Sequence, residues 1–181
     1  MFQRCEPQLV HVYPTSQQIA TGTTRLENRL NNLISTGRWW SKSKPIRRGL
    51  GLAQIAFFSG HPQARAEGAT ANLLLIVNEI QDQDEPTVER RFTPMRASTN
   101  ATAVYVGTVR TTSDYLWRKK KQLEKLQRRD GERRVFMVGP DQVGQENPHY
   151  GSFVEAQVRQ KGREHPSVTT ELFNEPVDTA A

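Results

Sequence analysis

A short apolar stretch that ends in amide and acidic side chains is the first candidate for chemistry in this sequence. Leu73 to Val77 are aliphatic, Asn78 and Glu79 follow at once, and Asp82 and Asp84 come shortly after. In an open parallel sheet, residues just beyond the carboxyl end of a strand face the ligand crevice. Oxygen side chains there can hold Mg²⁺ or orient a water molecule towards a phosphate. Alternatively, Asn78 and Glu79 begin a solvated turn, and the two aspartates cap the next helix.

A second candidate follows the next apolar stretch. The segment from Thr102 to Val106 leads into Gly107 and Thr108, so a glycine and a hydroxyl lie directly before a predicted helix. Backbone N–H groups and a hydroxyl in such a turn can contact a phosphate. An ordinary strand-to-helix loop has the same short pattern, which by itself is not specific.

Two basic segments are candidates for contact with nucleic acid. A predicted helix has nine Lys or Arg between Arg118 and Arg134, although a solvated helix face is the alternative. In the segment "GRWWSKSKPIRR", Trp39 and Trp40 lie among five cations, which suits stacking on nucleic acid, although burial of an indole against the sheet is the simpler interpretation. The helix residues assigned to phosphate contact are Arg118, Lys119, Lys120, Lys121, Arg128 and Arg129.

Length and composition favour one soluble, intracellular domain. The 181 residues include 25 Lys and Arg against 19 Asp and Glu, and the resulting charge of +6 is compatible with a polyanionic partner. The single Cys5 cannot form an internal disulfide, and no Cys or His pair has the spacing of a zinc site. No apolar run approaches the roughly 20 residues of a membrane span, and no signal peptide is recognisable. We therefore expect no contact with a membrane.

Apolar runs rich in β-formers alternate with helical patterns along the chain. Most runs are continuously apolar, which is typical of strands in a parallel sheet that is covered on both faces. The sequence therefore predicts an α/β fold with a mostly parallel sheet flanked by helices. The predicted strands are Val10 to Pro14, Ala53 to Phe58, Asn72 to Val77, Thr102 to Gly107 and Arg134 to Gly139.

Two helices have recognisable starting residues. Thr15 or Ser16 is the predicted N-cap of one, and Ser113 is the predicted N-cap of the other. The stretch from Gly37 to Gly51 is interpreted as a basic connection, and the residues after Pro176 as a frayed tail. The apolar faces are Ile19, Leu26, Leu30 and Leu33 in the first helix, and Leu116, Leu123 and Leu126 in the second.

Four segments, in order along nearly the whole chain, resemble one protein family. The stretch "FFSGHPQARAEGATANLLLIVNEIQDQD" is similar to the Walker B region of large terminase subunits, the ATP-driven motors that package DNA into tailed-phage capsids. The stretch "VGTVRTTSDYL" resembles the coupling motif of that family. "VHVYPTSQQIATGTTRLENRL" resembles the segment after its phosphate loop, and "GSFVEAQVRQKGREHPSVTTELF" the end of its ATPase domain.

The resemblance implies a P-loop NTPase-like ATPase domain over residues 1–175 and a flexible tail over 176–181. It implies ATP and Mg²⁺ as cofactors, with Glu79 activating water, Asn78 and Glu79 supporting the metal, and Gly107 and Thr108 sensing phosphate. The implied partners are double-stranded DNA, a portal protein, a small terminase subunit and further copies in a ring. The expected location is the cytoplasm of the host cell.

The sequence departs from the family pattern in three ways. It contains no G-x-x-x-x-G-K-[ST] phosphate loop, it lacks the acidic cluster of the family's nuclease, and Asn78 stands where the family usually has an aspartate. We therefore expect an incomplete ATPase domain that is inactive alone. The alternatives are a fragment of a helicase-like ATPase and a non-catalytic basic remnant that binds DNA or a partner.

Overall fold

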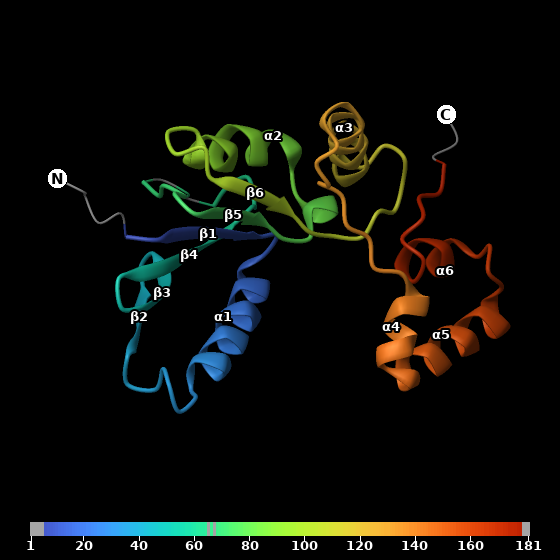
Figure 1. Cartoon of the computed structure of the whole chain (residues 1–181), viewed down its shortest axis with the longest axis horizontal. Helices are drawn as coiled ribbons and strands as arrows, with labels where there is room; N and C mark the ends of the chain where they lie inside the picture. The colour runs from blue at the N-terminus through green and yellow to red at the C-terminus, as the bar shows by residue number, and fades with distance from the viewer. Residues whose placement is uncertain (1–5, 65, 67, 179–181) are drawn as a thin grey trace. The chain divides into compact units, whose positions relative to one another are not determined.

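The computed structural model describes residues 6–64, 66 and 68–178, and the chain forms two compact units. The first ends at Val106 and contains a β-sheet with helices, whereas the second begins at Gly107 and is mainly helical (Figure 1). Cys5 lies outside the described residues. The assignment of residues 1–175 to one partial ATPase domain stays a prediction.

The sheet of the first unit has six strands in the order β2-β3-β4-β1-β5-β6. The strands β4, β1, β5 and β6 are parallel, and a hairpin of β2 and β3 joins β4 in antiparallel orientation. The predicted fold class is thus confirmed. The strands are β1 (Gln8–Tyr13), β2 (Trp39–Ser43), β3 (Ile46–Leu50), β4 (Ala53–Ser59), β5 (Leu74–Val77) and β6 (Thr102–Tyr105).

Two expectations about strands are wrong. The apolar run from Arg134 to Gly139 forms no strand, and Phe136 within it is 69% exposed. An apolar run becomes a strand only where a neighbouring strand pairs with its backbone N–H and C=O groups. No described strand pairs with residues 134–139. The stretch from Gly37 to Gly51 is not a plain connection, because it contains β2 and β3. Pairing with β4 explains why this polar stretch is extended.

The centre of one face of the sheet is buried. Val10, Val12, Leu75 and Val77 point to this face and are at most 1% exposed. Helical segments that follow β5 cover them, and the ring of Phe92 from these segments is also fully buried. Figure 1 shows α2 and α1 on opposite sides of the sheet. The covering segments are η1 (Ile80–Asp82), α2 (Glu85–Thr87), η2 (Val88–Phe92) and η3 (Thr93–Arg96).

Helix α1 (Ser16–Leu30) covers the other face near β1 and β4 (Figure 1). Thr15 caps it as predicted, since its hydroxyl accepts a hydrogen bond from the Gln18 N–H at 3.2 Å and the Gln18 side chain accepts one from the Thr15 N–H at 3.1 Å. The expectation that Leu33 extends the apolar face is wrong. The helix ends at Leu30, and Leu33 is fully exposed in the turn that follows.

The described part of the second unit contains four helices. They are α3 (Tyr115–Asp130), α4 (Pro140–Glu146), α5 (Pro148–Lys161) and α6 (Pro166–Glu171). The predicted cap Ser113 is wrong by one residue, because Asp114 holds the N-cap position of α3 and accepts the backbone N–H groups of Arg110 and Thr111. Val177, in the predicted tail, forms an isolated bridge with Thr111. None of the described helices combines the length and apolarity that crossing a membrane requires.

Truncation of Leu75 tests whether β5 anchors the first unit. Leu75 is fully buried, so Leu75→Ala should lower the free energy of unfolding by about 2 to 5 kcal/mol through lost burial and a residual cavity. Leu73→Ala is the matched control, because Leu73 is 55% exposed and lies just before the same strand. Urea titration followed by circular dichroism measures both changes. Equal losses in the two variants would contradict the placement of Leu75 in the core.

Candidate functional site

The candidate site lies at the carboxyl edge of the parallel strands. Val12 of β1 pairs in register with Val77 of β5, and Val77 pairs with Tyr105 of β6, so the three strands end at the same edge. The residues that follow β5 are Asn78 and Glu79, both half-buried. The structure therefore places both predicted residues where open parallel sheets bind ligands.

Backbone hydrogen bonds hold the segment after β5 on both sides. The Asn78 N–H donates to the Val12 carbonyl of β1 at 2.9 Å, and the Ile80 N–H donates to the Val106 carbonyl after β6 at 3.1 Å. The side chain of Ile80 is fully buried. Glu79 therefore lies between Asn78, which is anchored to β1, and Ile80, which is anchored to the residue after β6.

Glu79 has an unusual backbone conformation. Its φ of 47° and ψ of 51° lie in the left-handed region, which costs a non-glycine residue about 1 to 3 kcal/mol and is concentrated at functional sites. The side chain of Gln81 donates a hydrogen bond to Glu79 Oε2 at 2.7 Å. This contact orients the carboxylate and leaves its other oxygen, Oε1, without a partner among the described residues.

Gln83 is a site residue that the sequence analysis missed. Its buried side-chain amide donates to the Asn78 carbonyl at 2.6 Å, and so fixes the backbone that precedes Glu79. Gly60, just after β4, makes room for it: a Cβ at Gly60 would lie 1.9 Å from Gln83 Oε1. The position of Gly60, two residues after the end of a predicted strand, was the available signal for this edge.

The acidic residues after Glu79 divide into two kinds. Asp84 caps α2, because its carboxylate accepts hydrogen bonds from the backbone N–H and the hydroxyl of Thr87 at 2.9 and 2.6 Å. These hydrogen bonds hold the pKa of Asp84 below its usual value. The capping interpretation is therefore correct for Asp84, whereas the Asp82 N–H contributes to the turn by donating to the Glu79 carbonyl.

The described residues suit a Mg²⁺ site that phosphates and water complete better than a site made of protein ligands alone. No group of three or more His, Cys, Asp or Glu in the described part of the chain could hold a metal ion. Asn78 and Glu79 supply two neighbouring oxygen side chains, and Mg²⁺ is commonly held by one or two such groups together with phosphates and water. His11 packs against Tyr13 in the sheet, and burial lowers its pKa to about 4.

Gly107 and Thr108 are the first residues of the second unit. The expectation that they lie directly before a helix is wrong, since α3 begins only at Tyr115. The backbone that follows is held by the end of the chain: the Val109 N–H donates to Asn174 Oδ1 at 2.7 Å, and the Val177 N–H donates to the Arg110 carbonyl at 3.0 Å. A contact of Gly107 and Thr108 with phosphate stays a prediction.

Several cations of α3 already have partners within the helix. Lys120 and Lys121 lie 3.2 and 3.6 Å from the carboxylate of Glu124, and both amines lie over the ring of Trp117. Burial alone would raise the pKa of Glu124, but the hydrogen bond and the charge of Lys120 lower it. These two lysines are therefore less available to an external anion than the sequence suggested.

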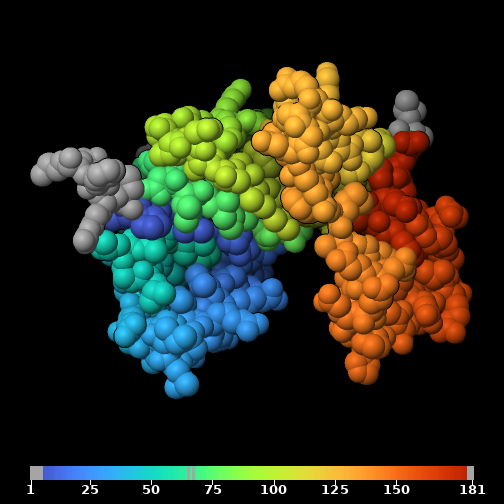
Figure 2. Space-filling model, viewed as in Figure 1, coloured from blue at the N-terminus to red at the C-terminus, as the bar shows by residue number. Residues whose placement is uncertain are grey.

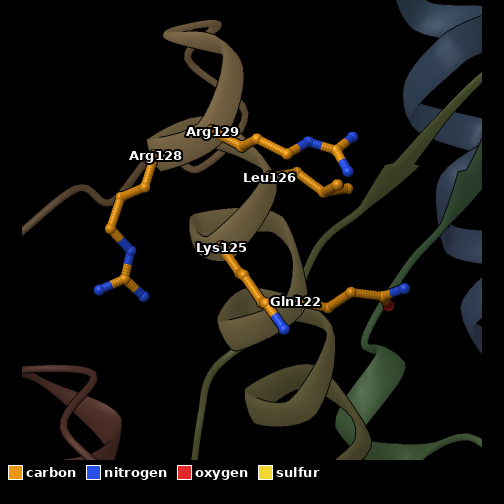
Figure 3. A pocket seen from close by; sticks show the side chains of 5 residues that line it. All are labelled: Gln122, Lys125, Leu126, Arg128 and Arg129. Carbon is orange, nitrogen blue, oxygen red and sulfur yellow. The ribbon is translucent and has the colours of Figure 1, made fainter.

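A shallow hollow on α3 is lined by residues of this one helix. Figure 3 shows the side chains of Arg128 and Arg129 pointing in different directions from the helix, rather than converging on one point. Both arginines are exposed. The hollow therefore presents separate cations to solvent and does not enclose a ligand. Its lining residues are Gln122, Lys125, Leu126, Arg128 and Arg129.

No protein-family model matches the chain, and no curated protein matches it. Solved structures do. A variant of the large-terminase ATPase domain of Thermus phage P74-26 is 12% identical with a TM-score of 0.66, over 97% of this chain and 79% of that domain. A large terminase from a thermophilic bacteriophage is 11% identical with a TM-score of 0.64, over 93% of this chain. The chain spans 40% of that terminase, and these likenesses show that it has the fold of large-terminase ATPase domains.

Pairs of substitutions on α3 test which of its cations contact duplex DNA. Arg128→Gln with Arg129→Gln should flatten the log–log dependence of affinity on salt by up to about 0.9 per lost phosphate contact. Lys120→Gln with Lys121→Gln should flatten it less, because Glu124 already neutralises part of that charge. Fluorescence anisotropy at several salt concentrations measures the slopes, with circular dichroism as the folding control. Unchanged slopes in both pairs would assign the helix face to solvation alone.

Proposed function

We propose that these 181 residues form part of an ATP-hydrolysing motor of the large-terminase type, which couples hydrolysis to the packaging of double-stranded DNA. One observation carries the proposal. In a chain with the fold of large-terminase ATPase domains, Glu79 is held in a strained conformation at the ligand-binding edge of the parallel sheet. A large terminase of similar fold, 15% identical with a TM-score of 0.53, was solved in complex with ADP.

In this proposal Glu79 orients the attacking water. Its Oε2 accepts the hydrogen bond from Gln81, which restricts rotation of the carboxylate and leaves Oε1 for the water. Asn78 and Glu79 would together hold Mg²⁺, which when bound neutralises charge on the phosphates. Gly107 and Thr108 contact the phosphate that is cleaved. Because positioning and electrostatic stabilisation carry most of the catalysis in phosphoryl transfer, a rigid Glu79 suits this role.

The residues that would hold the triphosphate are not among these 181. No phosphate loop occurs in the sequence, and the matching ATPase domain is longer than the part that this chain covers. β6 is the terminal strand of the described sheet, so its outer edge pairs with no described strand. The proposal therefore includes a segment outside these residues that supplies the phosphate loop next to β6.

The remaining assignments follow from the same proposal. The partners are double-stranded DNA, a portal protein, a small terminase subunit and further copies of the chain in a ring, and the place of action is the host cytoplasm. A second candidate is a non-catalytic protein that binds polyanions. Asn78 favours it, because an amide lacks the negative charge that suits a hard divalent cation.

The 181-residue chain alone should show no Mg²⁺-dependent ATP hydrolysis above that of its Glu79→Gln variant. Without a phosphate loop, most donors that position the triphosphate are missing, and Glu79 has no substrate to act on. Phosphate release measured with and without Mg²⁺ tests this. Clear turnover that depends on Glu79 would show that the described residues suffice for hydrolysis.

A longer protein that includes a phosphate-loop segment should respond oppositely to changes at the two neighbouring positions. Asn78→Asp should raise turnover, because it adds a negative charge near Mg²⁺, and Glu79→Gln should lower kcat by about 100-fold or more, because the water loses its acceptor. Glu155→Gln, the same charge change at an exposed position of α5, is the control. No effect of Asn78→Asp on nucleotide affinity or turnover would remove position 78 from the metal site.

A further inference from the structure

We infer that the β2–β3 hairpin, here residues 38–50, is a docking surface for the phosphate backbone of duplex DNA. Figure 2 shows this region, in blue to cyan, at the outer surface of the first unit. The surface itself is argued from its charges and geometry, and the inference rests on the proposed function only for the identity of the polyanion.

The excess positive charge of the whole chain is concentrated in the stretch of sequence that contains this hairpin. Between Glu27 and Glu67 the sequence contains seven Lys or Arg and no acidic residue. The rest of the chain then has 18 of the 25 cations against all 19 acids, so outside this segment positive and negative charges nearly cancel. A segment of this kind attracts a polyanion even where the protein as a whole is only moderately basic.

Two cations face each other across the hairpin. Lys42 of β2 pairs with Arg47 of β3 in the antiparallel register, so their side chains project from the same face. Like charges directly opposite each other destabilise a strand pair. In the described part of the chain neither side chain pairs with a carboxylate, and the same holds for Lys44 at the exposed turn. An external anion that bridges the pair would relieve this repulsion.

The guanidinium of Arg47 is fixed in place by a neighbouring strand. Its Nη1 donates to Gln54 Oε1 at 3.0 Å, which fixes the guanidinium on this face. Its Nε is buried and has no hydrogen-bond partner in the described structure. That atom is out of reach of an external anion, so Arg47 offers a phosphate the charge of a fixed guanidinium and not its Nε.

The indole of Trp40 packs within the hairpin and beside Lys42, so it is not available for stacking on bases. Its ring lies against Gly49, where a Cβ would come within 2.2 Å of the indole, and its Nε1 donates to the Gly51 carbonyl at 3.1 Å. The Lys42 amine lies over the ring, 5.6 Å from its centroid. Because protein groups occupy the indole, this surface favours contact with a phosphate backbone over stacking on single-stranded bases.

Protection of the sheet edge explains only part of this charge. β2 is the edge strand, and lysines on an edge prevent pairing with other chains. That explanation covers Lys42 but not Arg47, which lies on the inner strand β3.

The test compares two doubly substituted forms of the full 181-residue chain. Lys42→Gln with Arg47→Gln should flatten the log–log salt dependence of binding to a random-sequence duplex by about 0.9 per lost contact, measured by fluorescence anisotropy. The midpoint of thermal unfolding should stay equal or rise, because a like-charge pair is removed. Arg159→Gln with Lys161→Gln, two exposed cations of α5, makes the same change in net charge and should leave the slope unchanged.

Three outcomes would overturn the inference: a wild-type chain that does not bind the duplex, a hairpin variant with the wild-type slope, or a control variant whose slope flattens equally. If Arg47→Gln disturbs folding, Lys42→Gln with Lys44→Gln changes only exposed side chains and gives the same test. A longer protein that shows no hydrolysis dependent on Glu79 would refute the proposed function, but this result would not change the salt slopes of DNA binding. The two failures are therefore distinguishable.

Discussion

The candidate site depends on one constraint: β5 is hydrogen-bonded on both sides, to β1 and to β6, up to and beyond its last residue. A strand held in this way cannot slip in register without breaking bonds to both neighbours and turning its buried side chains to the other face. The buried Leu75 and Val77 add the cost of exposing apolar surface. The end of β5 is therefore a rigid support for the residues that follow it.

This rigidity explains how Glu79 keeps an unfavourable backbone conformation. The bonds from Asn78 to β1 and from Ile80 to the residue after β6 fix both neighbours of Glu79, so relaxation of its φ would break contacts on either side. Gln83 adds a further bond to the Asn78 carbonyl, and its position requires a glycine at 60. The geometry of the candidate acid thus depends on residues that have no chemistry of their own.

The two basic segments show that the same residue types differ in what they offer a partner. On α3, Glu124 lies one helical turn from Lys120 and Lys121, and the intramolecular pairs use part of their charge. On the hairpin, the antiparallel register places Lys42 opposite Arg47, and neither pairs with a carboxylate in the described structure, whereas the neighbouring Arg48 pairs with Glu27. Secondary structure therefore decides which cations are neutralised within the chain and which remain for an external anion.

The sequence by itself determined the features that depend on neighbouring residues. A continuously apolar run, a capping threonine and a change from Val77 to Asn78 and Glu79 are local patterns. They correctly predicted the four parallel strands, the start of α1 and the place of Glu79 directly after a strand. These elements were predictable although the chain is only 12% identical to the matching terminase domain, because the fold depends on such patterns more than on individual residues.

Only the tertiary structure decided the features that need a partner distant in the chain. Whether residues 37–51 pair as a hairpin depends on β4, and whether residues 134–139 form a strand depends on a neighbour that the described second unit lacks. The left-handed conformation of Glu79 and the role of Gln83 depend on contacts with β1, β4 and β6. A local pattern encodes a preference for extended or helical backbone, but hydrogen-bond partners and packing across the fold determine which preference is realised.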